Sequence, residues 1–322
     1  LKEDLSRRDF TFNAMAVDVA RRILYDPFNG TKDMENRLVR AVGDPMQRCD
    51  EDGLRIFRAY RFLDRGQLGL WHLESTLHQA MQSKQPILTK VAIERKWTEF
   101  QKIMNGRHAA DVLALMIYDG TIQHILPSLR FVRPELLDLF GKHFDESWLL
   151  KHRLGFLLVE FGPSEVKRSL GALKLPKSLL NQTLQFHRDL GTVPEPRTSS
   201  LRVFRYCLGE DANIHLRLQH LLVEISALVH GREPSKGSMT EVAVKWASLG
   251  PQHAPSESLV DGHWIMKRTG VEQGVRLGRL KNWLHRIQIE NDITEVDAIE
   301  LHLSRIPWQH GEPLEWPQLQ FP

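Results

Sequence analysis

Helical periodicity is the feature of this 322-residue sequence that most constrains its fold. From about residue 32 onward, apolar residues recur at spacings of three and four, and Gly or Pro separates many of the periodic segments. We expect helices over residues 44–65, 72–83, 91–105, 107–119, 134–141, 147–161, 163–173, 176–190, 199–207, 212–230, 239–249, 263–268, 271–289 and 294–304. The pattern predicts a mostly α-helical chain, with an irregular tail from Pro307.

Strand character is confined to the first part of the chain. Residues 10–25 have the composition of extended structure, and residues 26–30 contain the Pro and Asn-Gly pair typical of a turn. We expect a β-hairpin that closes onto a sheet. An isolated hairpin is not stable in water, and the chain opens on Leu1 instead of Met. We therefore expect that strands upstream of this chain complete the sheet.

Composition excludes several classes of protein. The formal net charge is only +3, so any RNA-binding surface must be a local patch. Cys49 and Cys207 lie far apart in the sequence, which predicts neither a disulfide framework nor a thiolate metal site. The longest apolar run, residues 154–159, is far shorter than the roughly 20 residues of a membrane span. We expect a cytoplasmic protein.

The first motif that could bind a ligand or take part in catalysis is Arg7-Arg8-Asp9, followed by Asn13. Guanidinium groups match phosphate oxygens in bidentate geometry, and Asp or Asn can hydrogen-bond a sugar hydroxyl. The motif therefore fits a site for a nucleoside triphosphate. A solvated charge cluster at the entry to a strand is the alternative that these residues alone leave open.

The second motif spans residues 43–62. In a continuous helix Asp52 and Arg55 would share one face, and Arg58 and Arg61 would continue the row. Cytosine and adenine each present an amino donor beside a ring-nitrogen acceptor, and uracil and guanine present the reverse pattern. A carboxylate beside a guanidinium could therefore accept C and A and reject U and G. Spacing alone favours the simpler alternative, an exposed ion pair worth a few tenths of a kcal/mol.

Taken together, residues 7–16, 26–30 and 51–62 resemble the successive motifs of the class II CCA-adding tRNA nucleotidyltransferase and bacterial poly(A) polymerase family, in the same order and spacing. Residues 91–99, 119–129 and 260–278 extend the resemblance over nearly the whole chain.

The resemblance implies a role for each matching residue. Arg8 would contact the nucleotide phosphates, and Asp9 and Asn13 would lie near the sugar or shape the strand. Asp52 and Arg55 would recognise the base. The remaining implied nucleotide-site residues, which would add positive charge, are Arg58 and Arg61.

One further segment matches the family, and three positions depart from it. Residues 26–30 would belong to the hinge between the head and the neck. Cys49, Gly53 and Tyr60 depart from the residues we would expect there. Gly53 would cost about 1 kcal/mol of stability inside a helix.

The implied fold is α+β. Residues 1–31 would be the C-terminal part of a nucleotidyltransferase head, and residues 32–130 a helical neck that recognises the nucleotide base. A helical body over 131–254, a helical tRNA-binding tail over 255–306 and an irregular C-terminal tail over 307–322 would follow.

The implied substrates are CTP and ATP, and the implied cofactor is Mg²⁺. In this family an Asp-x-Asp pair upstream of the Arg-Arg-Asp motif holds the metal, so we expect no metal ligands in this chain and no activity from it alone. The implied RNA partner is the acceptor arm and T-loop of tRNA, held through its backbone. The candidate phosphate-contacting residues are Lys151, Arg153, Lys167, Arg168, Lys174, Lys177, Arg276, Arg279 and Lys281.

Three alternatives remain open. The parent protein could be a poly(A) polymerase, it could add only CC or only A, or the chain could be a non-catalytic RNA-binding remnant. The sequence contains no His-Asp dipeptide, so we do not expect the phosphohydrolase activity that some family members carry.

Overall fold

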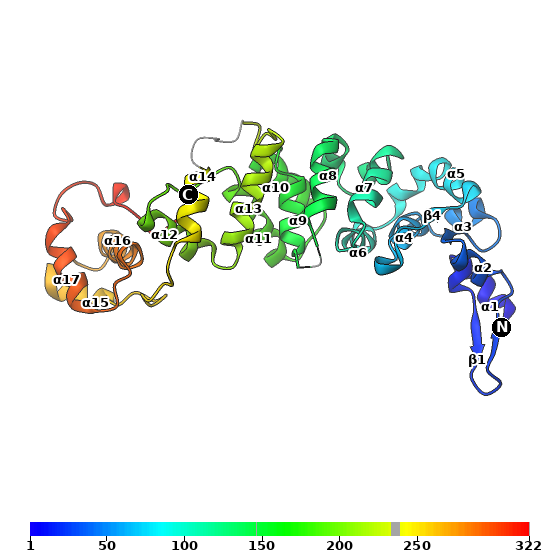
Figure 1. Ribbon diagram of the computed structural model, residues 1–322, viewed down its shortest axis with the longest axis horizontal. Helices are drawn as coiled ribbons and strands as arrows, with labels where there is room; N and C mark the ends of the chain where they lie inside the picture. Colours follow the sequence, from blue (N-terminus) through cyan, green and yellow to red (C-terminus); the bar gives the residue numbers. More distant parts are fainter. Residues whose placement is uncertain (146, 233–238, 322) are drawn as a thin grey trace. The chain divides into compact units, whose positions relative to one another are not determined.

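The computed structural model describes residues 1–145, 147–232 and 239–321. The chain forms two compact units, Leu1–Arg188 and Asp189–Pro322, which we describe separately. Within the described ranges helices dominate and two small two-stranded sheets accompany them (Figure 1), which confirms the expected α+β class. The border between the units lies inside the expected helical body at 131–254, and the finer five-part division remains a prediction.

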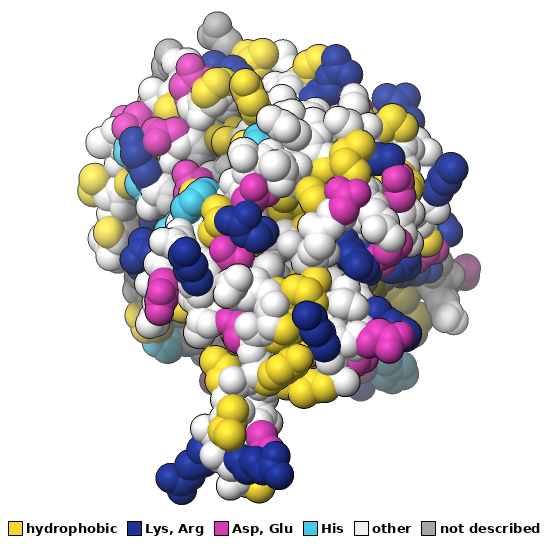
Figure 2. Space-filling view, turned by 90° about the vertical axis from the view of Figure 1, so that its right-hand side faces the viewer, with side chains coloured by type: hydrophobic (Ala, Val, Ile, Leu, Met, Phe, Trp, Pro, Cys, Tyr) yellow, Lys and Arg dark blue, Asp and Glu magenta, His cyan; other side chains and the backbone are white. Residues whose placement is uncertain are grey.

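The expected hairpin is present near the N-terminus. Strand β1 (Ala16–Asp18) pairs antiparallel with β2 (Ile23–Tyr25), with Val17 opposite Leu24. Its apolar side chains are exposed, by 61% at Val17 and 57% at Ile23. Figure 2 shows the hairpin projecting from the unit.

The expectation of extended structure holds at Phe10, which forms a β-bridge with Ala41, and is wrong over residues 11–13. A short helix, α1 (Lys2–Ser6), precedes the motif, and a 3₁₀ turn, η1 (Thr11–Asn13), follows it. The carboxylate of Asp9 accepts hydrogen bonds from the Phe10 amide at 2.9 Å and from the Asn13 side chain at 3.0 Å. These local side-chain bonds compete with strand pairing and fold the chain into a turn.

The turn after the hairpin leads into helix α2 (Gly30–Glu35). The Asp26 carboxylate accepts from the amides of Gly30 at 2.7 Å and Thr31 at 2.9 Å. Burial raises the pKa of Asp26, but hydrogen bonds from Thr31 and Gly30 outweigh it and hold that pKa below its usual value. A Cβ at Gly30 would lie 2.4 Å from the Thr11 carbonyl oxygen, so only glycine allows this close approach.

The expected helix over residues 44–65 is broken in the structure. Helix α3 (Pro45–Glu51) ends at Asp52, whose backbone is extended, and α4 (Leu54–Leu63) begins after Gly53. The Asp52 carboxylate accepts from the amide of Leu54, the first residue of α4, at 3.1 Å. Gly53 is therefore not a mid-helix glycine. A Cβ there would lie 2.8 Å from Ile87 Cγ2, so glycine permits close packing at the break.

Helix α4 fixes the side chains of interest in space. It packs mainly against α6, and it buries Ile56, Phe57 and Tyr60 while its arginines remain partly exposed. The other elements of this unit are β3 (Leu38–Val39), parallel to β4 (His72–Leu73), then α5 (Ser75–Ser83), η3 (Gln85–Lys90), α6 (Ile93–Met104), α7 (Ala109–Tyr118), η4 (Thr121–His124), η5 (Pro127–Phe131), α8 (Pro134–His143), α9 (Leu150–Leu157), α10 (Pro163–Gly171) and α11 (Lys177–Asp189).

The second unit is helical. Its elements are α12 (Thr198–Leu208), α13 (Asp211–Glu224), α14 (Met239–Ala247), α15 (Gly262–Thr269), α16 (Val275–Asn291), α17 (Val296–Arg305) and a 3₁₀ turn, η6 (Pro313–Glu315). Helix α16 packs against α12, α15 and α17, and Ile265, Leu280 and Ile299 are fully buried in the core around it. The expected helices from residue 199 to 304 are confirmed, with shifted ends. None of the described helices is long and apolar enough to cross a membrane.

Candidate nucleotide-binding site

The two motifs identified in the sequence meet in the first unit. The Asp9 carboxylate accepts hydrogen bonds from Arg58 Nε at 2.7 Å and from Arg58 Nη2. Asp9 is 8% exposed and its other oxygen is bonded to Asn13, so its hydrogen bonds are committed to the protein. The pair fixes the guanidinium of Arg58 in the part-exposed space between the N-terminal segment and α4.

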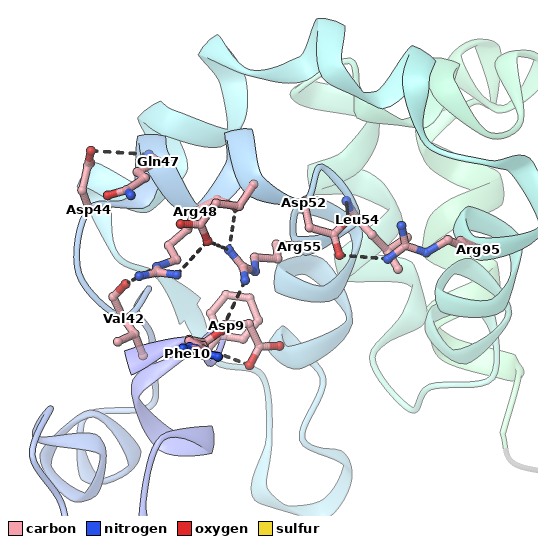
Figure 3. A network of polar contacts seen from close by, with 12 residues as sticks. Asp9, Phe10, Val42, Asp44, Gln47, Arg48, Asp52, Leu54, Arg55 and Arg95 are labelled. Carbon is pink, nitrogen blue, oxygen red and sulfur yellow. Dashed lines mark hydrogen bonds and ion pairs between the residues drawn. The ribbon is translucent and has the colours of Figure 1, made fainter. Parts of the chain in front are cut away.

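Arg55 also connects α4 to the N-terminal segment and to α3. Its Nη1 donates to Glu51 at 2.7 Å and to the Arg48 carbonyl at 2.9 Å, and its Nη2 donates to the Arg7 carbonyl at 3.3 Å (Figure 3). Arg48 approaches the same Glu51 oxygen at 2.7 Å. The hydrogen bond from Arg55, with the charge of Arg48, holds the pKa of Glu51 below its usual value.

Asp52 points in another direction. One of its oxygens accepts from the Leu54 amide, and the other lies 2.8 Å from Nη2 of Arg95 on α6. Figure 3 shows the Asp52–Arg95 pair on the opposite side of Arg55 from Arg48. The expectation that Asp52 and Arg55 share one helix face is wrong, because the chain leaves helical geometry at Asp52. The acid bonded to Arg55 is Glu51, four residues before it.

Arg61 and Arg8 have other partners. Arg61 Nε lies 2.7 Å from Glu99 Oε2, although the N–H is not aligned with that oxygen for a hydrogen bond. Burial lowers the pKa of Arg61, and the charge of Glu99 opposes this. The guanidinium of Arg8 approaches Asp4 at 3.8 Å, and both side chains are exposed. The structure thus brings together Asp9, Asn13, Arg55 and Arg58, and it places Arg8 and Arg61 at the margins.

An aromatic cluster lies beneath the arginines. Phe62 of α4 packs edge-on against Phe10 at 5.5 Å and Phe12 at 5.2 Å between ring centroids, and Phe12 meets Trp71 at 5.6 Å. Arg61 stacks over Phe62 at 4.0 Å. Neither this cluster nor the pairing of Glu51 and Arg95 with the site was expected from the sequence. The i, i+4 spacing of Glu51 and Arg55 was the one available signal for Glu51.

The acidic run of residues 50–52 does not fit a magnesium ion. Each carboxylate already faces a cation: Asp50 lies 2.5 Å from Lys84, Glu51 binds two arginines, and Asp52 binds Arg95. No group of three or more His, Cys, Asp or Glu among residues 1–145, 147–232 and 239–321 could hold a metal. A Mg²⁺ site therefore has no ligand set here, and we derive no step through the metal.

One candidate RNA contact is wrong. Arg153 is 2% exposed and donates to the carbonyls of Met104, Trp148 and Asp145 inside the first unit, so it cannot reach an RNA backbone. Lys174 pairs with Glu94 at 2.6 Å yet remains 65% exposed. Other candidates are exposed, namely Lys167, Arg168, Lys177 and Lys281.

Comparison with known families agrees with this architecture. Residues 1–40 match the poly A polymerase head domain, and residues 72–132 match the probable RNA and SrmB-binding site of polymerase A. The first match covers the N-terminal segment that holds Asp9, and the second includes α6, which holds Arg95. Both matches are to domains of poly A polymerase-type nucleotidyltransferases.

Individual relatives identify the family more closely. The CCA-adding enzyme of Geobacillus thermodenitrificans is 35% identical over 95% of this chain and 73% of its own length, and that of Streptococcus gordonii is 30% identical over 94% and 72%. The chain belongs to the family of CCA-adding enzymes. The solved Bacillus stearothermophilus CCA-adding enzyme in complex with CTP has the same fold, with a TM-score of 0.68 at 22% identity over 94% of this chain and 74% of that one.

Proposed function

We propose that this chain selects the base and binds the RNA in an enzyme that adds C and A from CTP and ATP to the 3′ end of tRNA without a template. The proposal depends on the contact of Asp9 with Arg58, because this contact brings the Arg7-Arg8-Asp9 motif against the motif of residues 43–62. Two related structures support it: one CCA-adding enzyme was solved with CTP and that of Thermotoga maritima with tRNA.

Base selection would rest on Asp52 and Arg55. In this proposal the two side chains turn from Arg95 and Glu51 towards the base, so that Asp52 accepts from the amino group of cytosine or adenine and Arg55 donates to the ring nitrogen beside it. The side chain of Asp52 is 33% exposed and that of Arg55 17%. A uracil or guanine would present a carbonyl oxygen to the carboxylate and a ring N–H to the guanidinium, and this mismatch rejects it.

The triphosphate would be held by arginines. Arg58, oriented by Asp9, and the exposed Arg8 are the proposed phosphate contacts, with Asn13 and Asp9 shaping the turn between them. Arg61 adds positive charge from its position against Glu99.

The RNA partner in this proposal is the acceptor arm and T-loop of tRNA, bound in the cytoplasm. Exposed basic side chains on the helical body and tail would neutralise its phosphates, as RNA helices offer few base edges to side chains. The alternative activity, poly(A) polymerisation, has the head-domain match in its favour.

Nucleotide binding tests the proposal without requiring turnover. We would titrate the chain with CTP, ATP, UTP and GTP by isothermal titration calorimetry. We expect tighter binding of CTP and ATP, and we expect Asp52→Ala to relax the selection against UTP. Asp138→Ala, at an exposed ion pair on α8, is the matched control and should leave selection intact.

Two results would count against the proposal. Equal affinity for all four nucleotides would refute base recognition at this site. Selection that persists unchanged in Asp52→Ala would refute the role of Asp52. A preference for ATP with no affinity for CTP would indicate the poly(A) polymerase alternative instead.

A further inference from the structure

Arg65 lies four residues after Arg61, just beyond the end of α4, and its guanidinium stacks on aromatic rings. The central guanidinium carbon is 4.6 Å from the centroid of the Trp71 ring and 5.4 Å from that of Phe12. Trp71 and Phe12 are 5% and 7% exposed, so the charge lies on rings that are themselves buried. Stacking of this kind attracts a cation and fixes the plane of the guanidinium without using its N–H groups.

Local hydrogen bonds hold the backbone on both sides of Arg65. The Asp64 carboxylate accepts from the amides of Gly66 at 2.8 Å and His108 at 2.6 Å. The Arg65 amide donates to the Gly69 carbonyl at 3.2 Å. The turn that carries Arg65 is therefore anchored to its surroundings, and the stacked side chain starts from a fixed point.

The charge of Arg65 differs from that of its neighbours because it has no acidic partner. Three guanidinium groups lie around the ring of Phe62. Their central carbons are 4.0, 5.6 and 5.9 Å from the ring centroid, in Arg61, Arg58 and Arg65 respectively. The first two groups each pair with a carboxylate. Among residues 1–145, 147–232 and 239–321, no carboxylate lies within ion-pair distance of Arg65, and its guanidinium makes no hydrogen bond.

An anion would relieve the repulsion that this arrangement creates. Burial is the largest cause that lowers the pKa of Arg61, and the charge of Arg65 lowers that pKa further. A guanidinium has five N–H donors in a planar fork, which match the oxygens of a phosphate in bidentate geometry. The unpaired charge and the free donors of Arg65 therefore favour a phosphate group as the missing partner.

The position of Arg65 relative to the nucleotide indicates which phosphate this is. With the base at Arg55 and a phosphate at Arg58, the nucleotide would run along α4 towards Arg65. The guanidinium groups of Arg58 and Arg65 lie around the same ring, so two linked phosphates can contact both. We propose that Arg65 binds the two terminal phosphates of the nucleoside triphosphate, the diphosphate that leaves as pyrophosphate. This inference rests on the proposed function, which places a phosphate at Arg58.

Ligands that differ in their number of phosphates provide the test. We would titrate the full chain with CTP, CDP, CMP and inorganic pyrophosphate by isothermal titration calorimetry. We expect Arg65→Gln to weaken the binding of CTP and pyrophosphate about five- to tenfold. Binding of CMP, which lacks the terminal phosphates, should change by less than about twofold. CTP and UTP should lose equal affinity, because Arg65 does not contact the base. Arg65→Lys keeps the charge but not the planar fork, so it should retain part of the affinity.

Arg130→Gln is the matched control. Arg130 also stacks on an aromatic ring, that of Phe131 at 4.6 Å, and it lies on η5 in the same unit. We expect this variant to bind CTP and pyrophosphate as the wild type does. Thermal unfolding of the Arg65 and Arg130 variants should match the wild type within a few degrees, which would separate a loss of binding from a loss of fold.

Three results would overturn the inference. If Arg65→Gln binds CTP and pyrophosphate as tightly as Arg130→Gln does, Arg65 contacts no phosphate of the nucleotide. If CMP loses as much affinity as CTP, the effect does not come from the terminal phosphates. If only the affinity for tRNA lacking its 3′ end falls, as measured by fluorescence anisotropy, Arg65 contacts the RNA backbone instead.

The same titrations separate this inference from the proposed base recognition. If the wild type binds all four nucleotides equally and Arg65→Gln still loses affinity for CTP and pyrophosphate, base recognition fails and the phosphate contact stands. If the wild type selects CTP and ATP and Arg65→Gln keeps full affinity for them, base recognition stands and the phosphate contact fails. If the wild type binds neither CTP nor pyrophosphate, both fail.

Discussion

Asp9 and Arg58, 49 positions apart in the sequence, form the bonded pair that joins the N-terminal segment to helix α4. Because Asp9 is buried and bonded to the Phe10 amide, Asn13 and Arg58, we expect it to influence a bound nucleotide through Arg58 and not by direct contact. This pair brings the Arg7-Arg8-Asp9 motif and the α4 arginines Arg55 and Arg58 together in one place.

Replacing Asp9 with Asn should weaken this site as a whole. We expect Asp9→Asn to lower the free energy of unfolding by about 2 kcal/mol, because it removes a charge-assisted pair that is largely buried. Affinity for all four nucleotides should fall by a similar factor, since Arg58 is proposed to contact phosphate. Urea unfolding and calorimetric titration measure the two effects. Asp138→Asn, at an exposed pair, should change neither, and a selective loss for one base would contradict the assignment.

Replacing Gly30 with Ala should be strongly destabilising. The new Cβ would lie 2.4 Å from the Thr11 carbonyl oxygen, so the backbone of α2 or η1 must shift. We expect a loss of about 3 kcal/mol in the free energy of unfolding, measured in urea. Gly171→Ala, at the end of α10 with nothing within 4 Å of its Cβ, should stay within about 1 kcal/mol of the wild type. Equal stability of the two variants would show that the close approach is not rigid.

Arg61 should matter for stability more than for nucleotide affinity. Arg61→Gln leaves the buried Glu99 carboxylate with Lys102, 3.1 Å away and half exposed, as its remaining cation. We expect the free energy of unfolding to fall by about 2 kcal/mol. Affinity for CTP should fall no more than about threefold, because Arg61 would contribute charge at a distance. A loss of CTP affinity as large as that of Arg58→Gln would instead indicate a direct phosphate contact.

Stability of the second unit should fall in mild acid because of His215. This residue is fully buried on α13, its Nε2 lies 2.6 Å from the Asp189 carbonyl, and burial lowers its pKa to about 4. Between about pH 6.5 and pH 4 the unfolded chain binds a proton that the folded chain does not. The contribution of His215 is therefore present above pH 6.5 and is lost as the pH falls towards 4, by at most about 3 kcal/mol.

Urea unfolding at several pH values measures this effect through tryptophan fluorescence. His215→Gln can still donate to the Asp189 carbonyl but does not titrate, so its stability should depend less on pH between 4 and 6.5. His220→Gln, at an exposed position of the same helix, should retain the wild-type slope. Identical slopes in all three proteins would refute the assignment to His215.

The sequence by itself determined the helical architecture, the hairpin and the family. Periodicity of apolar residues records which face of a helix is buried, and this is a local property. The Pro and Asn-Gly turn of residues 26–30 is local as well, and Asn29 indeed adopts the left-handed conformation with φ 58°. The order and spacing of the motifs carried the resemblance that the relatives confirm.

Tertiary structure alone decided which side chains face one another in the site. At the break between α3 and α4, the Asp52 carboxylate bonds to the Leu54 amide and to Arg95, which lies on another helix. Spacing within one segment gave no sign of that distant partner, and a continuous helix was the simpler expectation. Likewise, the burial of Arg153 depends on carbonyls from distant segments. Ion pairs and buried hydrogen bonds join residues remote in the chain, and the sequence pattern does not record their partners.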